Sequence, residues 1–183
     1  MKISIFNGNP DCNNQDFDNC LSSLAVILEK EKHELSLLQL REMEYHHCIG
    51  CLDCWVKTPG ICVFKDDHVK VLRSFLSSDL VIFASPLIVG FSSALLKKAQ
   101  DRLLPVILPY IDVSTGECRH YLRYGKAPVF GIIYQPEEDT DSEDLSIFTE
   151  LWTRFSRNAH SKVAFVRPIQ HSVQELSREI ARM

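Results

Sequence analysis

The stretch DLVIFASP, residues Asp79–Pro86, decides the fold of this chain. Its apolar residues run without a break from Leu80 to Ala84, a pattern that predicts a strand with both faces buried. Such strands are typical of parallel sheets that carry helices on both sides. The segment SSALLKKAQDRLL, residues 92–104, follows closely and predicts a helix that begins at a serine cap and ends near Pro105.

The same alternation of strand and helix continues along the whole chain. Further strands are predicted at KISIF, HELSLLQL, APVFGIIY and KVAFV, residues 2–6, 33–40, 127–134 and 162–166, and the first and third of these are expected to be buried. Helices are predicted over residues 17–31, from Asp66 or Asp67 to Phe75, and over 145–158 and 172–183. Strands that alternate with helices need right-handed crossovers and therefore form a parallel sheet. We predict a flavodoxin-like α/β fold, a three-layer doubly wound structure with a five-stranded parallel sheet in the order 2-1-3-4-5.

Apolar residues at helical spacing predict which face of each helix is buried. The first helix carries such a stripe at Leu21, Leu24, Ala25 and Leu28, and the second is predicted to turn Val69, Leu72 and Leu76 inward.

Composition limits both the number of domains and the partners. A chain of 183 residues with 45% apolar residues predicts one domain, residues 1–183. A net charge of −4 and the absence of a basic run argue against binding to nucleic acid or to anionic membranes. We expect the start MKISIFNGNP not to act as a signal peptide, and no apolar run approaches the roughly 20 residues of a membrane span. We expect a cytoplasmic protein, in which seven reduced cysteines indicate metal binding or catalysis.

Two connections are longer than the usual length of roughly 4–6 residues. One is a Cys-rich excursion over residues 41–65, and the other covers residues 106–126. Long excursions on an α/β scaffold are usually functional or interfacial, so both are candidates for determining specificity or contacts.

A ligand site is predicted at the carboxyl ends of the first and third strands, where an open parallel sheet binds its ligands. The loop NGNPDCNNQ, residues 7–15, is polar and leads into a helix N-terminus, which favours phosphate; it can also be read as a simple turn. After the third strand, Ile88, Val89 and Phe91 are expected to be exposed and to lie against a flat ring, or else to cover the core. The acidic segment QPEEDTDSED, residues 135–144, is most simply a solvated loop, although its first residues can also flank the same ligand. The candidate ligand-binding residues are Gly8, Asn9, Pro10, Asn13, Asn14, Gln15, Pro86, Leu87, Ile88, Val89, Gly90, Phe91, Ser92 and Ser93.

Three motifs together resemble those of one family. Gly8, Pro10 and Asn14 match a first-strand loop, TPGICVFKDD (residues 58–67) matches the end of a Cys-rich loop, and SPLIVGFSSALLKKAQDR (85–102) matches a third-strand segment. The chain thus resembles the NADPH-dependent FMN reductase and iron–sulfur flavoprotein branch of the flavodoxin-like superfamily, over at least residues 2–102. The resemblance implies FMN as cofactor, with its phosphate on the first loop and its ring on the third, and NAD(P)H as a co-substrate.

The chain departs from the family pattern at both loops. Asn9 and Asp11 stand where the family has Ser and Arg, and Gln15 replaces Ser or Thr. A carboxylate beside a phosphate is unfavourable because like charges repel at close range. Ile88 replaces the family's Tyr, so a ring there loses stacking. These changes predict FMN that binds weakly or exchanges as a substrate.

Four cysteines, Cys48, Cys51, Cys54 and Cys62, have the spacing C-x2-C-x2-C-x7-C. Three thiolates at intervals of three residues can hold one corner of a cubane, with a fourth from nearby. The resemblance implies a [4Fe–4S] cluster here. Zinc, a dithiol switch between Cys51 and Cys54, and unliganded thiols that fill apolar space remain alternatives.

The leading hypothesis is an FMN-dependent oxidoreductase, either an NAD(P)H:FMN or quinone-type reductase or an iron–sulfur flavoprotein that carries electrons. The alternative is a non-catalytic module that binds flavin or metal, with the Cys loop as a zinc or thiol redox site. We assign no catalytic side chain, since hydride transfer to a flavin needs no general base. The expected partners are a small redox substrate or an electron-carrier protein, and the resemblance implies a homo-oligomer, a dimer or tetramer.

Overall fold

A central sheet of five parallel strands carries the fold in the computed structural model, which describes residues 1–114 and 116–183. In spatial order the strands are β2 (Glu34–Gln39), β1 (Lys2–Asn7), β3 (Leu80–Ile88), β7 (Val129–Gln135) and β8 (Val163–Pro168). The predicted order 2-1-3-4-5 and the flavodoxin-like class are therefore confirmed. A short antiparallel strand, β4 (Phe91–Ser92), pairs with the end of β3 and was not predicted.

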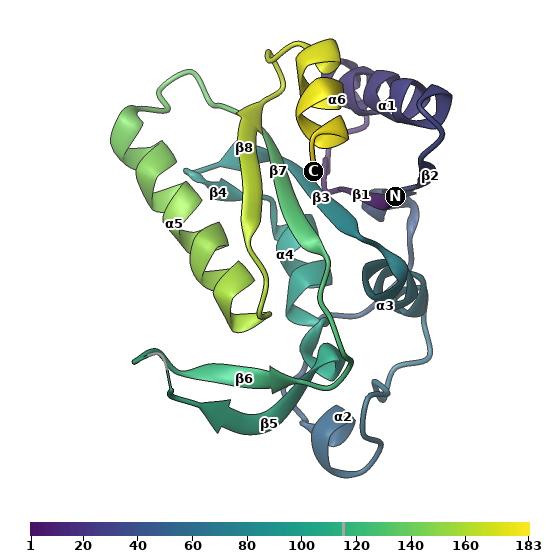
Figure 1. The fold of residues 1–183 in the computed structure, drawn as a ribbon, viewed down its shortest axis with the longest axis vertical. Helices are drawn as coiled ribbons and strands as arrows, with labels where there is room; N and C mark the ends of the chain where they lie inside the picture. The colour runs from purple at the N-terminus through teal and green to yellow at the C-terminus, as the bar shows by residue number, and fades with distance from the viewer. Residues whose placement is uncertain (115) are drawn as a thin grey trace.

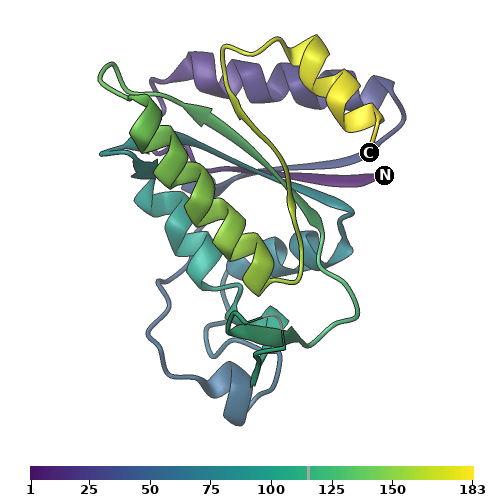
Figure 2. The same cartoon turned by 60° about the vertical axis from the view of Figure 1, so that its left-hand side comes forward.

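Helices cover both faces of this sheet, as Figures 1 and 2 show. One face packs against α1 (Gln15–Lys30) and α6 (Val173–Ala181), and the other packs against α3 (His68–Ser77), α4 (Ala94–Asp101) and α5 (Ser142–Asn158). Two apolar clusters, one on each face, bury the alternating side chains of β1 and β3. The unbroken apolar run of β3 is explained by this arrangement, because both of its faces lie in a core.

The predicted inner face of the first helix is confirmed, since its four apolar stripe residues are all buried. The prediction for α3 was wrong at Val69, which is 45% exposed. The helix instead buries His68, Val71 and Phe75. The other two predicted residues, Leu72 and Leu76, are half-buried and pack against the core cluster on that side of the sheet, so the prediction fails at Val69 alone.

The two long excursions pack against each other at one end of the molecule, below the sheet in Figure 1. The first contains the 3-10 turn η1 (Leu40–Glu42) and the short helix α2 (Asp53–Val56), and the second follows the turn η2 (Leu104–Val106) with the ribbon β5 (Ile107–Asp112) and β6 (Arg119–Leu122). Trp55 Nε1 donates to the carbonyls of Leu104 at 3.2 Å and Ile107 at 2.9 Å, and its ring lies 5.1 Å from that of His120. The predicted excursion 106–126 includes Thr115, which lies outside the described residues.

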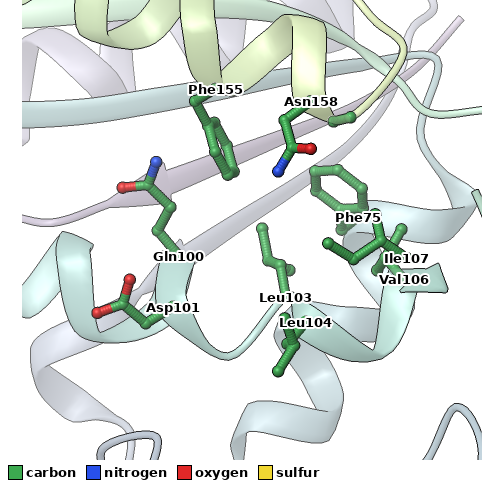
Figure 3. Close-up of a pocket in the computed structure, with 10 residues that line it drawn as sticks. Phe75, Gln100, Asp101, Leu103, Leu104, Val106, Ile107, Phe155 and Asn158 are labelled. Atoms are coloured by element: carbon green, nitrogen blue, oxygen red, sulfur yellow. The ribbon is translucent and has the colours of Figure 1, made fainter. Parts of the chain in front are cut away.

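A small, mostly apolar cavity of about 180 Å³ lies beside this junction, between the end of α4, η2 and α5 (Figure 3). Leu103, Val106 and Phe155 line it and no cluster of charged groups converges there. Within the described part of the chain, no helix has the length and apolar character needed to cross a bilayer.

Candidate functional site

The loops that follow β1 and β3 meet at the carboxyl edge of the sheet. Gly8 N–H donates to the Ala84 carbonyl at 2.8 Å, and Ser93 Oγ donates to the Gly8 carbonyl at 2.5 Å. Ser93 is buried and also caps α4, accepting from Leu96 N–H at 3.1 Å, as the predicted serine cap requires. A Cβ atom on Gly8 would lie 2.6 Å from Leu96 Cβ and 3.1 Å from the Ala84 carbonyl oxygen, so the first loop lies too close to α4 and β3 for any side chain there.

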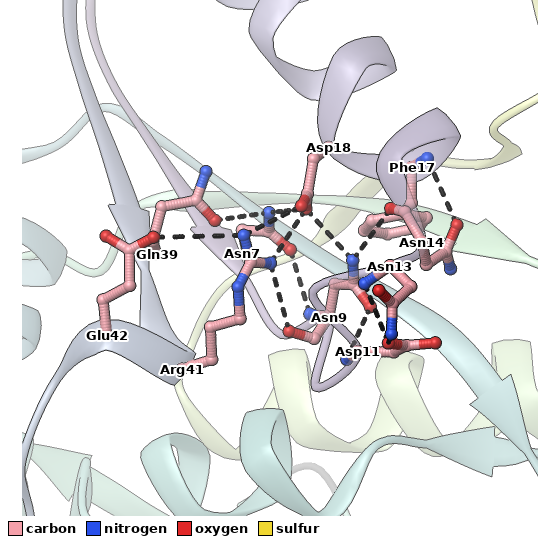
Figure 4. A network of polar contacts seen from close by, with 10 residues as sticks. All are labelled: Asn7, Asn9, Asp11, Asn13, Asn14, Phe17, Asp18, Gln39, Arg41 and Glu42. Carbon is pink, nitrogen blue, oxygen red and sulfur yellow. Dashed lines mark hydrogen bonds and ion pairs between the residues drawn. The ribbon is translucent and has the colours of Figure 1, made fainter.

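The first loop is held by a network around Asp18, which Figure 4 shows. Asp18 Oδ1 accepts hydrogen bonds from Asn7 at 2.7 Å, Asn9 at 3.1 Å and Arg41 at 3.1 Å, and Arg41 also pairs with Oδ2 at 2.8 Å. Burial raises the pKa of Asp18, but the hydrogen bonds from Arg41, Asn7 and Asn9 and the charge of Arg41 outweigh it and leave the pKa below its usual value. Asp18 and Arg41 were not predicted, because no local spacing links two residues from different elements.

Asn9 supports the loop from within. It is fully buried, its amide nitrogen donates to the Asn14 carbonyl at 3.1 Å and its amide oxygen accepts from Asp11 N–H at 3.1 Å. The predicted ligand contact from the Asn9 side chain is therefore not available in this conformation. Of the other candidates in the loop, Pro10, Asn13 and Gln15 are exposed.

Asn14 links the first loop to the end of β7. Its side chain accepts from Phe17 N–H at 3.4 Å, as the N-cap of α1, and donates to Gln135 Oε1 at 2.6 Å. Asp11 shapes the neighbouring turn, since its Oδ1 accepts both the N–H of Asn13 at 2.9 Å and the Asn13 side chain at 3.1 Å. Much of the hydrogen-bonding capacity of this loop is thus satisfied by the loop itself.

The β3–β4 connection forms a tight hairpin whose two turn residues, Val89 and Gly90, have φ of 54° and 73°. This backbone is the favoured two-residue hairpin turn, in which a β-branched residue such as Val89 is strained. Ile88, Val89 and Phe91 are 46%, 80% and 53% exposed, as predicted. Leu87 differs from the other candidates because it is buried in the core and supports the hairpin from below. Pro86, Gly90 and Ser92 are half-buried.

Glu137 caps this hairpin. Its Oε1 accepts from Val89 N–H and its Oε2 accepts from Gly90 N–H, both at 2.9 Å. The N–H groups of Gly90 and Val89 lower the pKa of Glu137 because they stabilise its charged form. A carboxylate of the protein itself therefore occupies the two backbone donors of the hairpin turn.

A mostly apolar groove of about 370 Å³ adjoins the hairpin. It lies between β4, α4 and α5 and is lined by Phe91, Ser92, Lys97, Gln100, Phe148, Leu151 and Trp152. It offers room for a flat apolar group next to the exposed Phe91 ring.

The four cysteines of the first excursion differ in burial. Cys48 and Cys51 are exposed, Cys62 is half-buried and Cys54 is buried. Burial raises the pKa of Cys54, and the charges of Cys62, Cys48 and Cys51 raise it further, which places the four sulfurs in one electrostatic neighbourhood. Across residues 1–114 and 116–183, however, no three His, Cys, Asp or Glu side chains are spaced to hold a metal ion. The donor chemistry fits a thiolate-held metal or cluster, and ligation requires the sulfurs to draw closer.

The junction of the two loops and Cys62 lie at opposite ends of α4. Ser93, its N-cap, contacts Gly8, whereas Arg102, its C-cap, donates from Nη2 to Cys62 Sγ at 3.3 Å. Because α4 has eight residues and an α-helix rises by about 1.5 Å per residue, the two ends of α4 lie about 12 Å apart.

Comparisons with known proteins agree with this architecture. The chain is 32% identical to an iron–sulfur flavoprotein of Methanocaldococcus jannaschii over 106 residues, 58% of this chain and 53% of that protein. It is 31% identical to an iron–sulfur flavoprotein of Clostridioides difficile over 130 residues, 64% of this chain and 55% of that protein. The chain thus spans about half the length of these curated relatives.

Solved structures share the fold at low sequence identity. An FMN-dependent NADH-azoreductase from Bacillus anthracis in complex with FMN superposes with a TM-score of 0.66 and 12% identity, covering 100% of this chain and 99% of that chain. The family profile described as NADPH-dependent FMN reductase matches residues 1–112, more than half of the 183 residues. The matched residues include both loops that meet at the carboxyl edge of the sheet, those after β1 and β3, and the chain belongs to the NADPH-dependent FMN reductase family.

Proposed function

We propose that the chain is an FMN-dependent oxidoreductase that uses NAD(P)H as a reductant. The observation that carries the proposal is the junction of Gly8 and Ser93, which brings the polar first loop and the apolar hairpin together at the switch point of the sheet, where we place the flavin crevice. In this proposal the FMN phosphate lies on the loop of residues 8–15, and the ring lies on the hairpin of residues 86–93.

The residues of the crevice fit a flat, phosphorylated ring. FMN, when bound, supplies hydride and single-electron chemistry. Ile88, Val89 and Phe91 offer an exposed apolar surface for the ring, and the nicotinamide would stack on its open side. The N–H groups of Val89 and Gly90 would stabilise negative charge on a ring placed against the hairpin, once Glu137 has left them.

Several carboxylates favour FMN that exchanges readily. Asp11 lies in the proposed phosphate loop, and Asp16 and Asp18 lie in the first turn of α1. Arg41 brings a positive charge to the loop, but Asp18 already pairs with it. A phosphate would therefore meet little free positive charge here, and we propose that FMN acts as a dissociable cofactor or substrate.

We also propose that Cys48, Cys51, Cys54 and Cys62 hold a [4Fe–4S] cluster that exchanges electrons with an electron-carrier protein. The names of the two curated relatives and the shared neighbourhood of the four sulfurs support this assignment. A second candidate is a zinc or thiol redox site in a non-catalytic module, which is favoured by the exposure of Cys48 and Cys51.

The remaining proposals concern assembly and location. The ribbon β5–β6 exposes Tyr110, Ile111 and Tyr121, at 67%, 55% and 47%, which supports a homo-oligomer, a dimer or tetramer. The seven free cysteines support a reducing, cytoplasmic location.

Protein purified without oxygen tests the function directly. We expect flavin absorbance bands at about 370 and 450 nm after addition of FMN, and loss of the 450 nm band when NADPH or NADH is added. Iron and sulfide analysis of the same sample tests the cluster. A colourless protein that takes up no FMN would overturn the proposed oxidoreductase function and would favour the second candidate, a non-catalytic module.

Replacing Glu137 with alanine is expected to tighten FMN binding by roughly tenfold. In the parent, FMN must first displace two charge-assisted hydrogen bonds between the hairpin N–H groups and Glu137, and the variant lacks them. Calorimetric titration of the variant and the parent measures the change. The exposed neighbour Glu138 is the matched control, and Glu138→Ala should bind FMN as the parent does. Weaker or unchanged binding by Glu137→Ala would show that the ring does not use these two donors.

A further inference from the structure

A fully buried arginine ends α4. The Arg102 side chain is 1% exposed, and it heads the largest fully buried side chains of the described residues. Burial of a guanidinium is strongly unfavourable unless charge and hydrogen bonds compensate it. Other groups must therefore compensate for the burial of the Arg102 charge.

Arg102 bonds to both ends of the cysteine loop. Its Nη1 donates to Asp66 Oδ2 at 2.7 Å and to the His46 carbonyl at 3.1 Å, and its Nη2 donates to Cys62 Sγ at 3.3 Å. The guanidinium carbon also lies 5.4 Å from the centre of the Phe64 ring. One side chain thus contacts His46, two residues before the first of the four cysteines, and also the last cysteine and two of the next four residues.

These contacts close a neck, which we define as residues 44–46 and 64–67. His46 N–H donates to Asp66 Oδ2 at 3.0 Å, and the His46 ring stacks on Phe64 with centres 4.5 Å apart. Glu44 and Asp67 bond to each other twice, through Glu44 N–H to Asp67 Oδ2 at 3.1 Å and Asp67 N–H to the Glu44 carbonyl at 3.2 Å. The neck seals a loop, residues 47–63, that contains all four cysteines.

A purely structural role leaves part of this arrangement unexplained. A carboxylate alone would neutralise the guanidinium, yet Arg102 directs a second arm at a sulfur, and its buried Nε has no partner. Four thiolates around a metal carry excess negative charge, and a fixed cation beside one of them offsets it most effectively where water is excluded. Hydrogen bonds to ligand sulfurs are a general means by which proteins tune such sites.

We propose that Arg102 is the positioning residue of the cysteine site: it closes the neck, holds Cys62 Sγ by a hydrogen bond and supplies the fixed positive charge that a thiolate-held metal needs. The proposal rests on the proposed function of the four cysteines as ligands. It assigns to the Asp-Arg pair at the end of α4 a role in the thiol site, at the end of the helix opposite the crevice.

Two variants and one control separate the parts of this role. Arg102→Met removes the charge and the donors at similar length, Arg102→Lys keeps the charge without the forked geometry, and Arg73→Met changes an exposed arginine on α3. In metal-free protein, hydrogen exchange of the His46 and Asp67 amides should be at least tenfold faster in both Arg102 variants and unchanged in Arg73→Met. This readout needs no metal.

Cobalt titration tests the charge. The sulfur-to-metal absorbance of Co²⁺ should show binding weakened at least tenfold in Arg102→Met, and Arg102→Lys should recover most of that loss even though its neck still exchanges rapidly. Parental cobalt binding by Arg102→Met, or a Lys variant as weak as the Met variant, would overturn the charge role.

The outcomes also separate this inference from the proposed function. A parent protein that binds neither cobalt nor iron would remove the cysteine site, and with it the charge role of Arg102. If the neck amides of Arg102→Met exchange at the parental rate, Arg102 does not close the neck, whichever metal the parent protein binds.

Discussion

Gly8→Ala is expected to lower the free energy of unfolding by about 2–3 kcal/mol and to weaken FMN binding by more than tenfold. The new Cβ would lie 2.6 Å from Leu96 Cβ and 3.1 Å from the Ala84 carbonyl oxygen, so the β1 loop has to move away from β3 and α4. Because Gly8 also accepts the Ser93 hydroxyl, the movement opens the junction on which the proposed crevice depends. Urea denaturation and FMN titration measure the two effects on one preparation.

Gly125 provides the matched control, since a Cβ there would meet nothing within 4 Å. Gly125→Ala should leave both the midpoint of unfolding and the FMN affinity unchanged. A Gly8→Ala protein that is destabilised but binds FMN at the parental affinity would place the flavin elsewhere. A protein with parental stability would show that the loop accommodates the methyl group at no cost.

Acidification is expected to destabilise the protein through His68. Burial lowers the pKa of His68 from 6.5 to about 4, so the folded protein keeps this imidazole neutral. Between these two values the unfolded chain binds the proton and the folded chain does not, so the free energy of unfolding falls as the pH falls from about 6.5 to about 4. The loss is on the order of 3 kcal/mol across that window, and above pH 7 the contribution is constant.

The environment of His68 explains why it stays neutral. Its Nε2–H donates a hydrogen bond to the Ala99 carbonyl at 2.9 Å, and its Nδ1 is buried without a partner. A proton on Nδ1 would place a charge in the core, next to the guanidinium of Arg102, whose charge also lowers the pKa. His68→Gln keeps a donor for Ala99 and removes the titration.

Urea denaturation between pH 4 and 7 checks this prediction. The stability of His68→Gln should fall less steeply with acidification than that of the parent, whereas His47→Gln, at an exposed position, should follow the parent. Equal slopes for the parent and His68→Gln would mean that His68 already takes up its proton in the folded state.

Much of the fold could be predicted because its signals are local. The apolar runs of β1, β3 and β7 and the periodic stripe of α1 are each contained in one short segment, and the handedness of crossovers then leaves few ways to order the strands. The β4 hairpin and the β5–β6 ribbon escaped prediction, since neither has a strong alternating pattern. On α3 the position of Val69 was misassigned and the burial of His68 was missed, because a histidine looks polar in a sequence.

Sequence by itself determined the five strand–helix units, the order of the sheet, the meeting of the first and third loops and the grouping of the four cysteines, because each follows from residue patterns a few positions long combined with a general rule of chain topology. Tertiary structure alone decided which side chains from other elements hold those loops by hydrogen bonds. Arg41 reaches Asp18 across 23 residues, Arg102 reaches Cys62 across 40, and Glu137 reaches Val89 across 48. Such pairs depend on how separate elements pack, and no periodicity along the chain records that geometry.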